Sequence, residues 1–167
     1  MNQEKFLWYN SRRDLVFILG AGASHPEGVP LQKDIIPIMF SGDYPEIENS
    51  DLGKKVLEFI RENFTISEKE NIYPEMEAVF GFLDYFITEN ESLNSKYTYL
   101  ALREIREALI KLIHYVINQS SDKVSSVYKE FWRLIDNHNR NSSIITLNYD
   151  TMLEQSFEFL FPHKGLI

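Results

Sequence analysis

Two short runs rich in strand-forming residues stand out in a chain whose other hydrophobic positions mostly recur at helical spacing. Residues 15–19, LVFIL, lie between Asp14 and Gly20, and residues 142–148, SSIITLN, lie near the other end. Runs of this length, rich in Val, Ile and Phe, are typical of strands buried on both faces of a parallel sheet. The pattern therefore predicts two strands, each followed by a turn and a helix.

The stretch between the two strands has a different pattern, with apolar residues at the three- and four-residue spacing of amphipathic helices. The Ser-Asp pair before residue 52 is typical of a helix N-terminus. The predicted helices cover residues 50–64, 73–87, 95–119 and 123–138, and the third carries the apolar stripe Leu102, Ile105, Leu109, Leu112, Ile113 and Val116. We therefore expect a large helical insertion over residues 43–140.

Shorter helices are predicted at residues 3–12, 29–40 and 149–161, with Pro37 expected to end or kink the second of them. The order strand–turn–helix occurs twice, which puts both turns at one edge of a doubly wound sheet, where ligands bind. The fold class predicted is thus α/β, a Rossmann-like parallel sheet within a single domain over residues 1–167. With two strands the sheet is incomplete, and its uncovered apolar faces favour a homo-oligomer or a partner domain.

Composition narrows the classes of function. The formal net charge of −8 over 167 residues argues against a nucleic-acid surface and against binding to anionic membranes. No run approaches the roughly 20 apolar residues that cross a bilayer, and we expect a soluble cytoplasmic protein. The absence of cysteine excludes disulfides, thiolate catalysis and cysteine-bound zinc, and no His or carboxylate spacing predicts a metal site.

The turn after the first strand is Gly20-Ala21-Gly22-Ala23-Ser24. Glycines let the backbone approach a ligand closely, and successive amides at a strand-to-helix turn point at an anion. His25 occupies the position of the third glycine in the dinucleotide fingerprint G-x-G-x-x-G, so the dehydrogenase form of that fingerprint is not met. From these residues alone, a phosphate-binding loop and a tight corner both remain open.

The turn after the second strand contains Asn148 and Asp150. Taken alone, Asp150 is expected to cap the following helix and Asn148 to satisfy loose backbone groups. Because both turns meet at one sheet edge, an amide and a carboxylate would also face the glycine loop. A carboxamide matches another carboxamide donor for acceptor, as nicotinamide would require.

These residues carry a resemblance to a known family. The segment GAGASHPEGVP, residues 20–30, resembles the sirtuin motif in which Gly-Ala-Gly-x-Ser precedes Gly-[Ile/Val]-Pro. The segment TLNYD, residues 146–150, resembles the Asn-x-Asp motif in the Asn-Tyr-Asp form of bacterial sirtuin-like domains. The segment NIYPEMEAVFGFLDYF, residues 71–86, is similar to a Glu-centred helix of their insert.

The resemblance implies an NAD site and cleavage of the nicotinamide–ribose bond. By carry-over, residues Gly20 to Ser24 would hold the pyrophosphate, and Pro30 would shape the nicotinamide side. Asn148 would position a water beside the reacting ribose carbon, and Asp150 would hold the nicotinamide amide. Bacterial sirtuin-like domains lack the zinc of the deacylases, and several of them hydrolyse NAD in antiphage defence.

The sequence departs from the family at its catalytic histidine, which is expected several tens of residues after Asn-x-Asp. Only His163 follows, too early and without a glycine after it. We expect His163 to be an exposed helix-end residue and His25 a polar residue at a helix start. A structural or solvent-exposed role, and not a functional one, is also expected for the remaining polar candidates: His114, His138, Glu75, Glu77 and Glu154.

Several functions stay open at this point. The first is an NAD-binding domain that hydrolyses NAD in its complete form. The second is a non-catalytic nucleotide-binding or assembly module with NAD or ADP-ribose as ligand. A protein deacylase and a helical interaction protein are further alternatives.

Overall fold

The computed structural model describes residues 15–138 and 141–164, and these form a mostly helical α/β protein with a two-stranded parallel sheet. The chain divides into two compact units. The first contains Met1–Val29 and Ile117–Ile167, and the second contains Pro30–Val116. The second unit starts earlier and ends earlier than the 43–140 insertion expected from the sequence.

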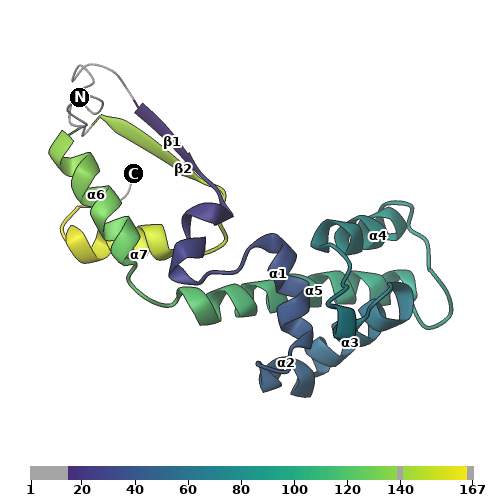
Figure 1. Cartoon of the computed structure of the whole chain (residues 1–167). Coiled ribbons are helices and arrows are strands. Elements are labelled where there is room, and N and C mark those ends of the chain that lie inside the picture. Colours follow the sequence, from purple (N-terminus) through teal and green to yellow (C-terminus); the bar gives the residue numbers. More distant parts are fainter. Residues whose placement is uncertain (1–14, 139–140, 165–167) are drawn as a thin grey trace. The chain divides into compact units, whose positions relative to one another are not determined.

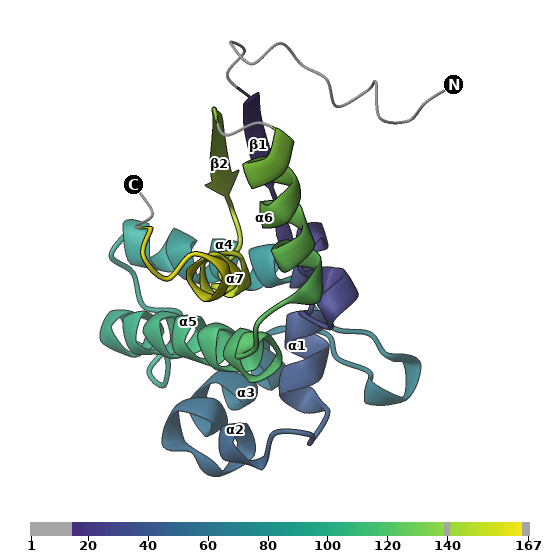
Figure 2. The ribbon, with the colours of Figure 1, turned by 90° about the vertical axis from the view of Figure 1, so that its left-hand side faces the viewer.

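The sheet of the first unit pairs β1 (Leu15–Leu19) with β2 (Ser142–Thr146). The strands are parallel, with Leu15 opposite Ser142 and Leu19 opposite Thr146. Figures 1 and 2 show the two strands side by side and pointing the same way. Both predicted strands are confirmed, and because they are parallel their carboxyl ends meet at one edge.

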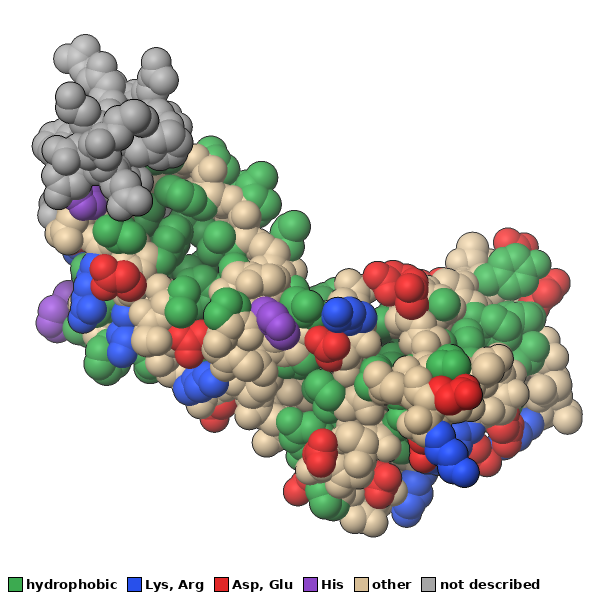
Figure 3. All heavy atoms as spheres, viewed as in Figure 1, with side chains coloured by type: hydrophobic (Ala, Val, Ile, Leu, Met, Phe, Trp, Pro, Cys, Tyr) green, Lys and Arg blue, Asp and Glu red, His purple; other side chains and the backbone are tan. Residues whose placement is uncertain are grey.

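The expectation that both faces of these strands are buried is wrong for the described part of the chain. Side chains alternate between half-buried and exposed along each strand, and Val16, Ile18 and Ile145 are exposed. On the opposite face, Phe17 packs edge-on against Phe131, with ring centroids 5.3 Å apart. The reason is that helical cover among the described residues lies on one face only. Hydrophobic side chains gather over β1 and β2 in Figure 3.

Two helices complete the first unit around the sheet, α6 (Ser126–His138) and α7 (Met152–Leu160). The indole N–H of Trp132 donates to the carbonyl of Leu153 at 2.9 Å, and its ring meets that of Phe157 at 4.8 Å. Burial of these aromatic rings fixes α6 against α7. Helix α6 begins close to the glycine loop, so its first turn borders the candidate site.

The second unit is all helical apart from its connecting loops. Its helices are α1 (Gln32–Phe40), α2 (Pro45–Asn49), α3 (Asp51–Asn63), α4 (Met76–Thr88) and most of α5 (Tyr99–Ser121). The predicted stripe of α5 is confirmed, because all six of its apolar residues are buried. Phe59 of α3 is fully buried and packs against the rings of Phe64, Phe82 and Tyr97.

Local sequence signals explain several helix ends. The hydroxyl of Ser50 accepts the amide of Gly53 at 2.9 Å, as the Ser-Asp pair predicts for the start of α3. Helix α1 continues through Pro37 to Phe40, so this proline does not end it. Leu52, expected on the buried face of α3, is 41% exposed. The helix predicted for residues 3–12 lies outside the described residues.

Within residues 15–138 and 141–164, no helix is long and apolar enough to cross a membrane.

Candidate functional site

The two sequence motifs are brought together at the carboxyl edge of the sheet. Pairing continues one step past the strands, where the amide of Leu147 donates to the carbonyl of Leu19 at 2.8 Å. The residues that follow this pair are Gly20 after β1 and Asn148 after Leu147. This edge is where parallel α/β sheets place ligands, because both turns open there.

Ser24 lies at the centre of the contact between the motifs. It is fully buried, and its hydroxyl oxygen lies 2.9 Å from the hydroxyl of Tyr128 and accepts a hydrogen bond from Nδ2 of Asn148, also at 2.9 Å. The Asn148 nitrogen lies 3.5 Å from the Tyr128 hydroxyl. Ser24 therefore joins the glycine loop to the Asn-Tyr-Asp turn.

The carboxamide of Asn148 uses its nitrogen in this contact and leaves its oxygen unused. Oδ1 of Asn148 is buried and has no hydrogen-bond partner among the described residues. A buried acceptor without a partner costs free energy on the order of 1–3 kcal/mol, which a bound donor would recover. A hydrogen-bond donor brought to this oxygen would therefore be stabilised there.

Asp150 is buried, and its Oδ1 accepts the amide of Met152 at 3.1 Å at the start of α7. The expectation that Asp150 caps this helix is wrong in its position, because the N-cap of α7 is Thr151 and Asp150 lies one residue before it. Oε2 of Glu154, one turn later, is buried without a described partner. Burial raises the pKa of the Tyr128 hydroxyl, and the charges of Asp150 and Glu154 raise it further. Tyr128 consequently stays protonated at neutral pH.

The backbone of the glycine loop is open. It runs through the 3₁₀ turns η2 (Ala21–Ala23) and η3 (His25–Glu27), and the amides of Ala23 and Ser24 bond within the loop. The amides of Ala21 and Gly22 donate to no other described residue. A Cβ placed on Gly20 or Gly22 would meet no heavy atom within 4 Å. Packing of the protein therefore gives no reason for either glycine, whereas close approach of a ligand would.

Gly28 differs, because its φ of +89° ends η3 in the left-handed conformation that favours glycine.

Glu27 anchors the end of this loop to the start of α6. Its Oε1 accepts from the hydroxyls of Ser125 and Ser126, each at 2.9 Å, and from the amide of Val127 at 3.0 Å. These three donors lower the pKa of Glu27 from its ordinary 4.5 to about 2. Because Tyr128 follows one residue later, this anchor also fixes the position of Tyr128 relative to Ser24.

The other candidates from the sequence are placed as follows. Nδ1 of His25 lies 3.1 Å from the carbonyl of Val29, within the turn that follows the glycine loop. His163 is exposed beyond the end of α7. Pro30 is half-buried and is the first residue of the second unit. Four more side chains are exposed, those of Glu75, Glu77, His114 and His138.

Residues 15–138 and 141–164 contain no group of three His, Cys, Asp or Glu side chains arranged to hold a metal ion.

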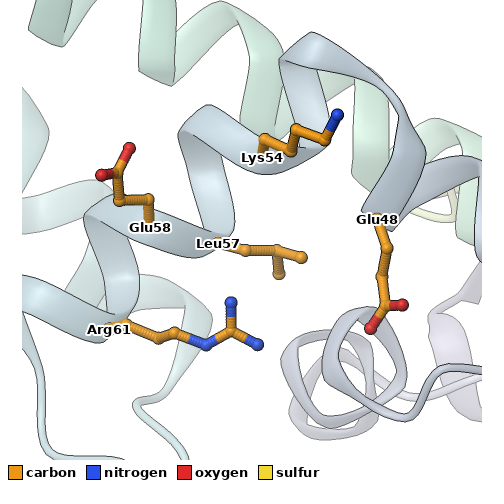
Figure 4. Close-up of a pocket in the computed structure, with 5 residues that line it drawn as sticks. All are labelled: Glu48, Lys54, Leu57, Glu58 and Arg61. Carbon is orange, nitrogen blue, oxygen red and sulfur yellow. The ribbon is translucent and has the colours of Figure 1, made fainter.

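The second unit has a hollow of its own along α3, with a volume of about 280 Å³ (Figure 4). The hollow is lined by the apolar side chain of Leu57 and by four charged side chains, those of Lys54, Arg61, Glu48 and Glu58. Cations and carboxylates are equal in number here, so the hollow has no net charge that would select an anion. The guanidinium of Arg61 also lies 5.0 Å from the centre of the Phe40 ring. The first unit therefore offers the better site.

Reasoning from the sequence missed two residues, Tyr128 and Glu27. Tyr128 lies on an ordinary amphipathic helix, where an aromatic residue indicates packing. Glu27 lies in the polar turn between Ser24 and Gly28, and the donors that it accepts from are about a hundred residues away. The only local signal is the Ser125-Ser126 pair, which is typical of a helix start.

The chain matches no family model, no curated protein and no solved structure in the comparisons made.

Proposed function

We propose that the carboxyl edge of the β1–β2 sheet is a sirtuin-like binding site for NAD, in a Rossmann-like fold with two strands among residues 15–138 and 141–164. The observation that carries the proposal is the 2.9 Å hydrogen bond between Nδ2 of Asn148 and Oγ of Ser24. It joins the two segments whose sequences resemble the family. A shared ligand site requires that the two segments meet in this way.

The glycine loop supports the pyrophosphate end of this proposal. The amides of Ala21 and Gly22, which bond to no other residue that the structure describes, lie in a turn directly after a strand, as anion-binding backbone does. Ser24 contributes differently from the expectation that it holds the pyrophosphate, since its hydroxyl is buried against Tyr128 and Asn148. We assign the anion to the backbone amides and give Ser24 a structural role between the two motifs.

The other end of the site supports the nicotinamide riboside. The carboxylates of Asp150 and Glu154 raise the pKa of the Tyr128 hydroxyl, which lies 3.5 Å from Nδ2 of Asn148, so two negative side chains act on this end of the site. A negative potential favours the cationic nicotinamide ring and the positive charge that develops on the ribose as the bond to nicotinamide breaks. Asn148 Oδ1 would accept from a ribose hydroxyl or from the attacking water. The reaction that we expect at this site is hydrolysis of NAD to nicotinamide and ADP-ribose.

A second function, nucleotide binding without turnover, is favoured by the position of His163. This histidine is the only one after Asn148, and it is exposed past the end of α7. Tyr128 is held protonated, and Asp150 is engaged with the amide of Met152. A module of this kind would bind NAD or ADP-ribose and leave it intact.

The test is isothermal titration of NAD and of ADP-ribose into the full chain, followed by chromatography of the products. Binding of either ligand supports the site, and release of nicotinamide identifies the hydrolase. Binding without release identifies the non-catalytic module. Nicotinamide release that requires an acylated lysine peptide would identify the deacylase. Absence of heat with both ligands at millimolar concentration would refute the NAD site.

A matched pair of variants locates the binding. Asn148→Ala removes the carboxamide, whereas Asn141→Ala changes an asparagine before β2, at the other end of the sheet. A weakened but measurable affinity in the first variant, with an unchanged affinity in the second, supports the assignment. Equal affinities in both variants would place the ligand elsewhere.

A further inference from the structure

Tyr128 is the residue that most closely connects the two motifs, although it belongs to neither. It is 3% exposed and lies in the first turn of α6. Its backbone amide donates to the hydroxyl of Ser125 at 3.0 Å, and that hydroxyl donates to Glu27. The position of the ring is therefore fixed from its own helix and from the end of the glycine loop.

The hydroxyl of Tyr128 is shared between the two motifs. It lies 2.9 Å from the Ser24 oxygen and 3.5 Å from the Asn148 nitrogen. The Ser24 oxygen in turn accepts from the same nitrogen. The two hydroxyl oxygens lie only 2.9 Å from each other, so they occupy the same side of the amide nitrogen and share the direction of one N–H donor. This arrangement turns the amide so that Oδ1 is the atom left without a partner.

We propose that Tyr128 is a positioning residue for the nucleotide site: through Ser24 it holds the Asn148 carboxamide so that Oδ1 faces a hydrogen-bond donor of the bound ligand. This role rests on the proposed function. Tyr128 itself does not touch the ligand in this role. Its effect passes through Asn148, which makes the effect separable from simple packing.

The test uses Tyr128→Phe, which keeps the ring and removes only the hydroxyl. A net hydrogen bond of ordinary strength corresponds to a loss of about five- to tenfold in affinity for ADP-ribose. The matched control is Tyr97→Phe, because Tyr97 is also buried and its hydroxyl donates to Glu62 at 2.7 Å in the second unit. The control is expected to bind like the wild type.

A double-mutant cycle on the same affinities separates positioning from packing. If Tyr128 acts through Asn148, then Tyr128→Phe weakens binding in the wild-type background but causes no further loss in Asn148→Ala. Independent losses that multiply would overturn the proposal, as would an unchanged affinity in Tyr128→Phe. A wild-type chain that binds neither ligand refutes the proposed function itself, which is a different outcome from both.

A measurement without ligand completes the design. The side-chain amide of Asn148 is assigned in the ¹H–¹⁵N spectrum as the pair of signals that disappears in Asn148→Asp. These signals are expected to move toward those of solvated asparagines in Tyr128→Phe and to stay in place in Tyr97→Phe. Unmoved signals in Tyr128→Phe would overturn the positioning role. Should Tyr128→Phe fail to fold, Ser24→Ala removes the intervening hydroxyl and is judged by the same two measurements.

Discussion

The anchor at Glu27 gives a prediction whose size can be worked out from the structure. One carboxylate oxygen accepts three hydrogen bonds at the first turn of α6, from Ser125, Ser126 and Val127. Glu27→Ala removes the acceptor and the charge together, and Glu27→Gln keeps an acceptor oxygen and removes only the charge. Both variants are expected to lower the free energy of unfolding of the first unit.

Loss of a side-chain acceptor at a helix start costs about 1 kcal/mol, and loss of a negative charge there costs about 0.5 kcal/mol. These values are at the low end of what such losses cost, because Glu27 is partly exposed. In addition, the hydroxyl of Ser125 still accepts the amide of Tyr128 and so caps the helix in the variants. Glu27→Ala should then cost about 1.5 kcal/mol, and Glu27→Gln about 0.5 kcal/mol. For a chain of this size, the larger loss lowers Tm by about 3–6 °C.

The dependence on pH follows from the lowered pKa of Glu27, about 2 in the folded protein against an ordinary 4.5. A lowered pKa means that the charged form stabilises the fold, so this contribution is fully present above pH 4.5. It is lost progressively as the pH falls from 4.5 to 2. The difference in stability between the wild type and Glu27→Gln should therefore shrink between pH 7 and pH 3.

The assay is urea unfolding at both pH values, followed by tryptophan fluorescence. Trp132 lies on α6 and packs against α7, so its emission reports on the first unit. Glu130→Gln is the matched control, because Glu130 lies on the same helix in an exposed ion pair with Arg133 at 3.7 Å. Such pairs contribute little, and the control should stay within about 0.5 kcal/mol of the wild type. A Glu27→Gln difference that is equal at pH 7 and pH 3, or a Glu27→Ala loss no larger than the change in the control, would refute the reasoning.

Four further variants concern three glycines and a helix start. Gly53→Ala would place a Cβ 1.7 Å from the carbonyl oxygen of Ile47 and should cost at least about 2 kcal/mol in thermal unfolding, whereas Gly81→Ala, in an open position on α4, should gain about 0.5–1 kcal/mol. Ser50→Ala removes the cap of α3 and should cost about 1 kcal/mol in the same measurement. Gly22→Ala should leave Tm unchanged and lower the affinity for ADP-ribose, measured by isothermal titration, at least tenfold. An affinity equal to that of the wild type would contradict the assignment of this turn as the phosphate-binding loop.

The elements of this fold were predictable where one physical signal dominates. The strand-forming runs at residues 15–19 and 142–148 predicted β1 and β2. The stripe of six apolar residues between Leu102 and Val116 predicted α5. The buried-face prediction failed for Val16 and Ile18, because β-forming composition indicates a strand but does not reveal how many layers cover it.

The candidate site was predictable only in its two motifs. Chain order and the parallel arrangement suffice to bring Ser24 near Asn148, since both follow strands that end at one edge. The contributions of Tyr128 and Glu27 depend on where α6 starts relative to the glycine loop. That placement is a tertiary contact over about a hundred residues, and no local pattern encodes it.

The pairing of Leu15 with Ser142 means that the whole helical unit is one long loop closed by two short strands. The entropy of closing a loop grows only with the logarithm of its length, so doubling the insert would cost about 0.6 kcal/mol. The same long-range pairing makes the sheet slow to form compared with the helices, whose contacts are local. Helices can thus be added to or removed from the insert at little cost to the strand pair, which frees that part of the chain to diverge in size while the sheet edge keeps its geometry.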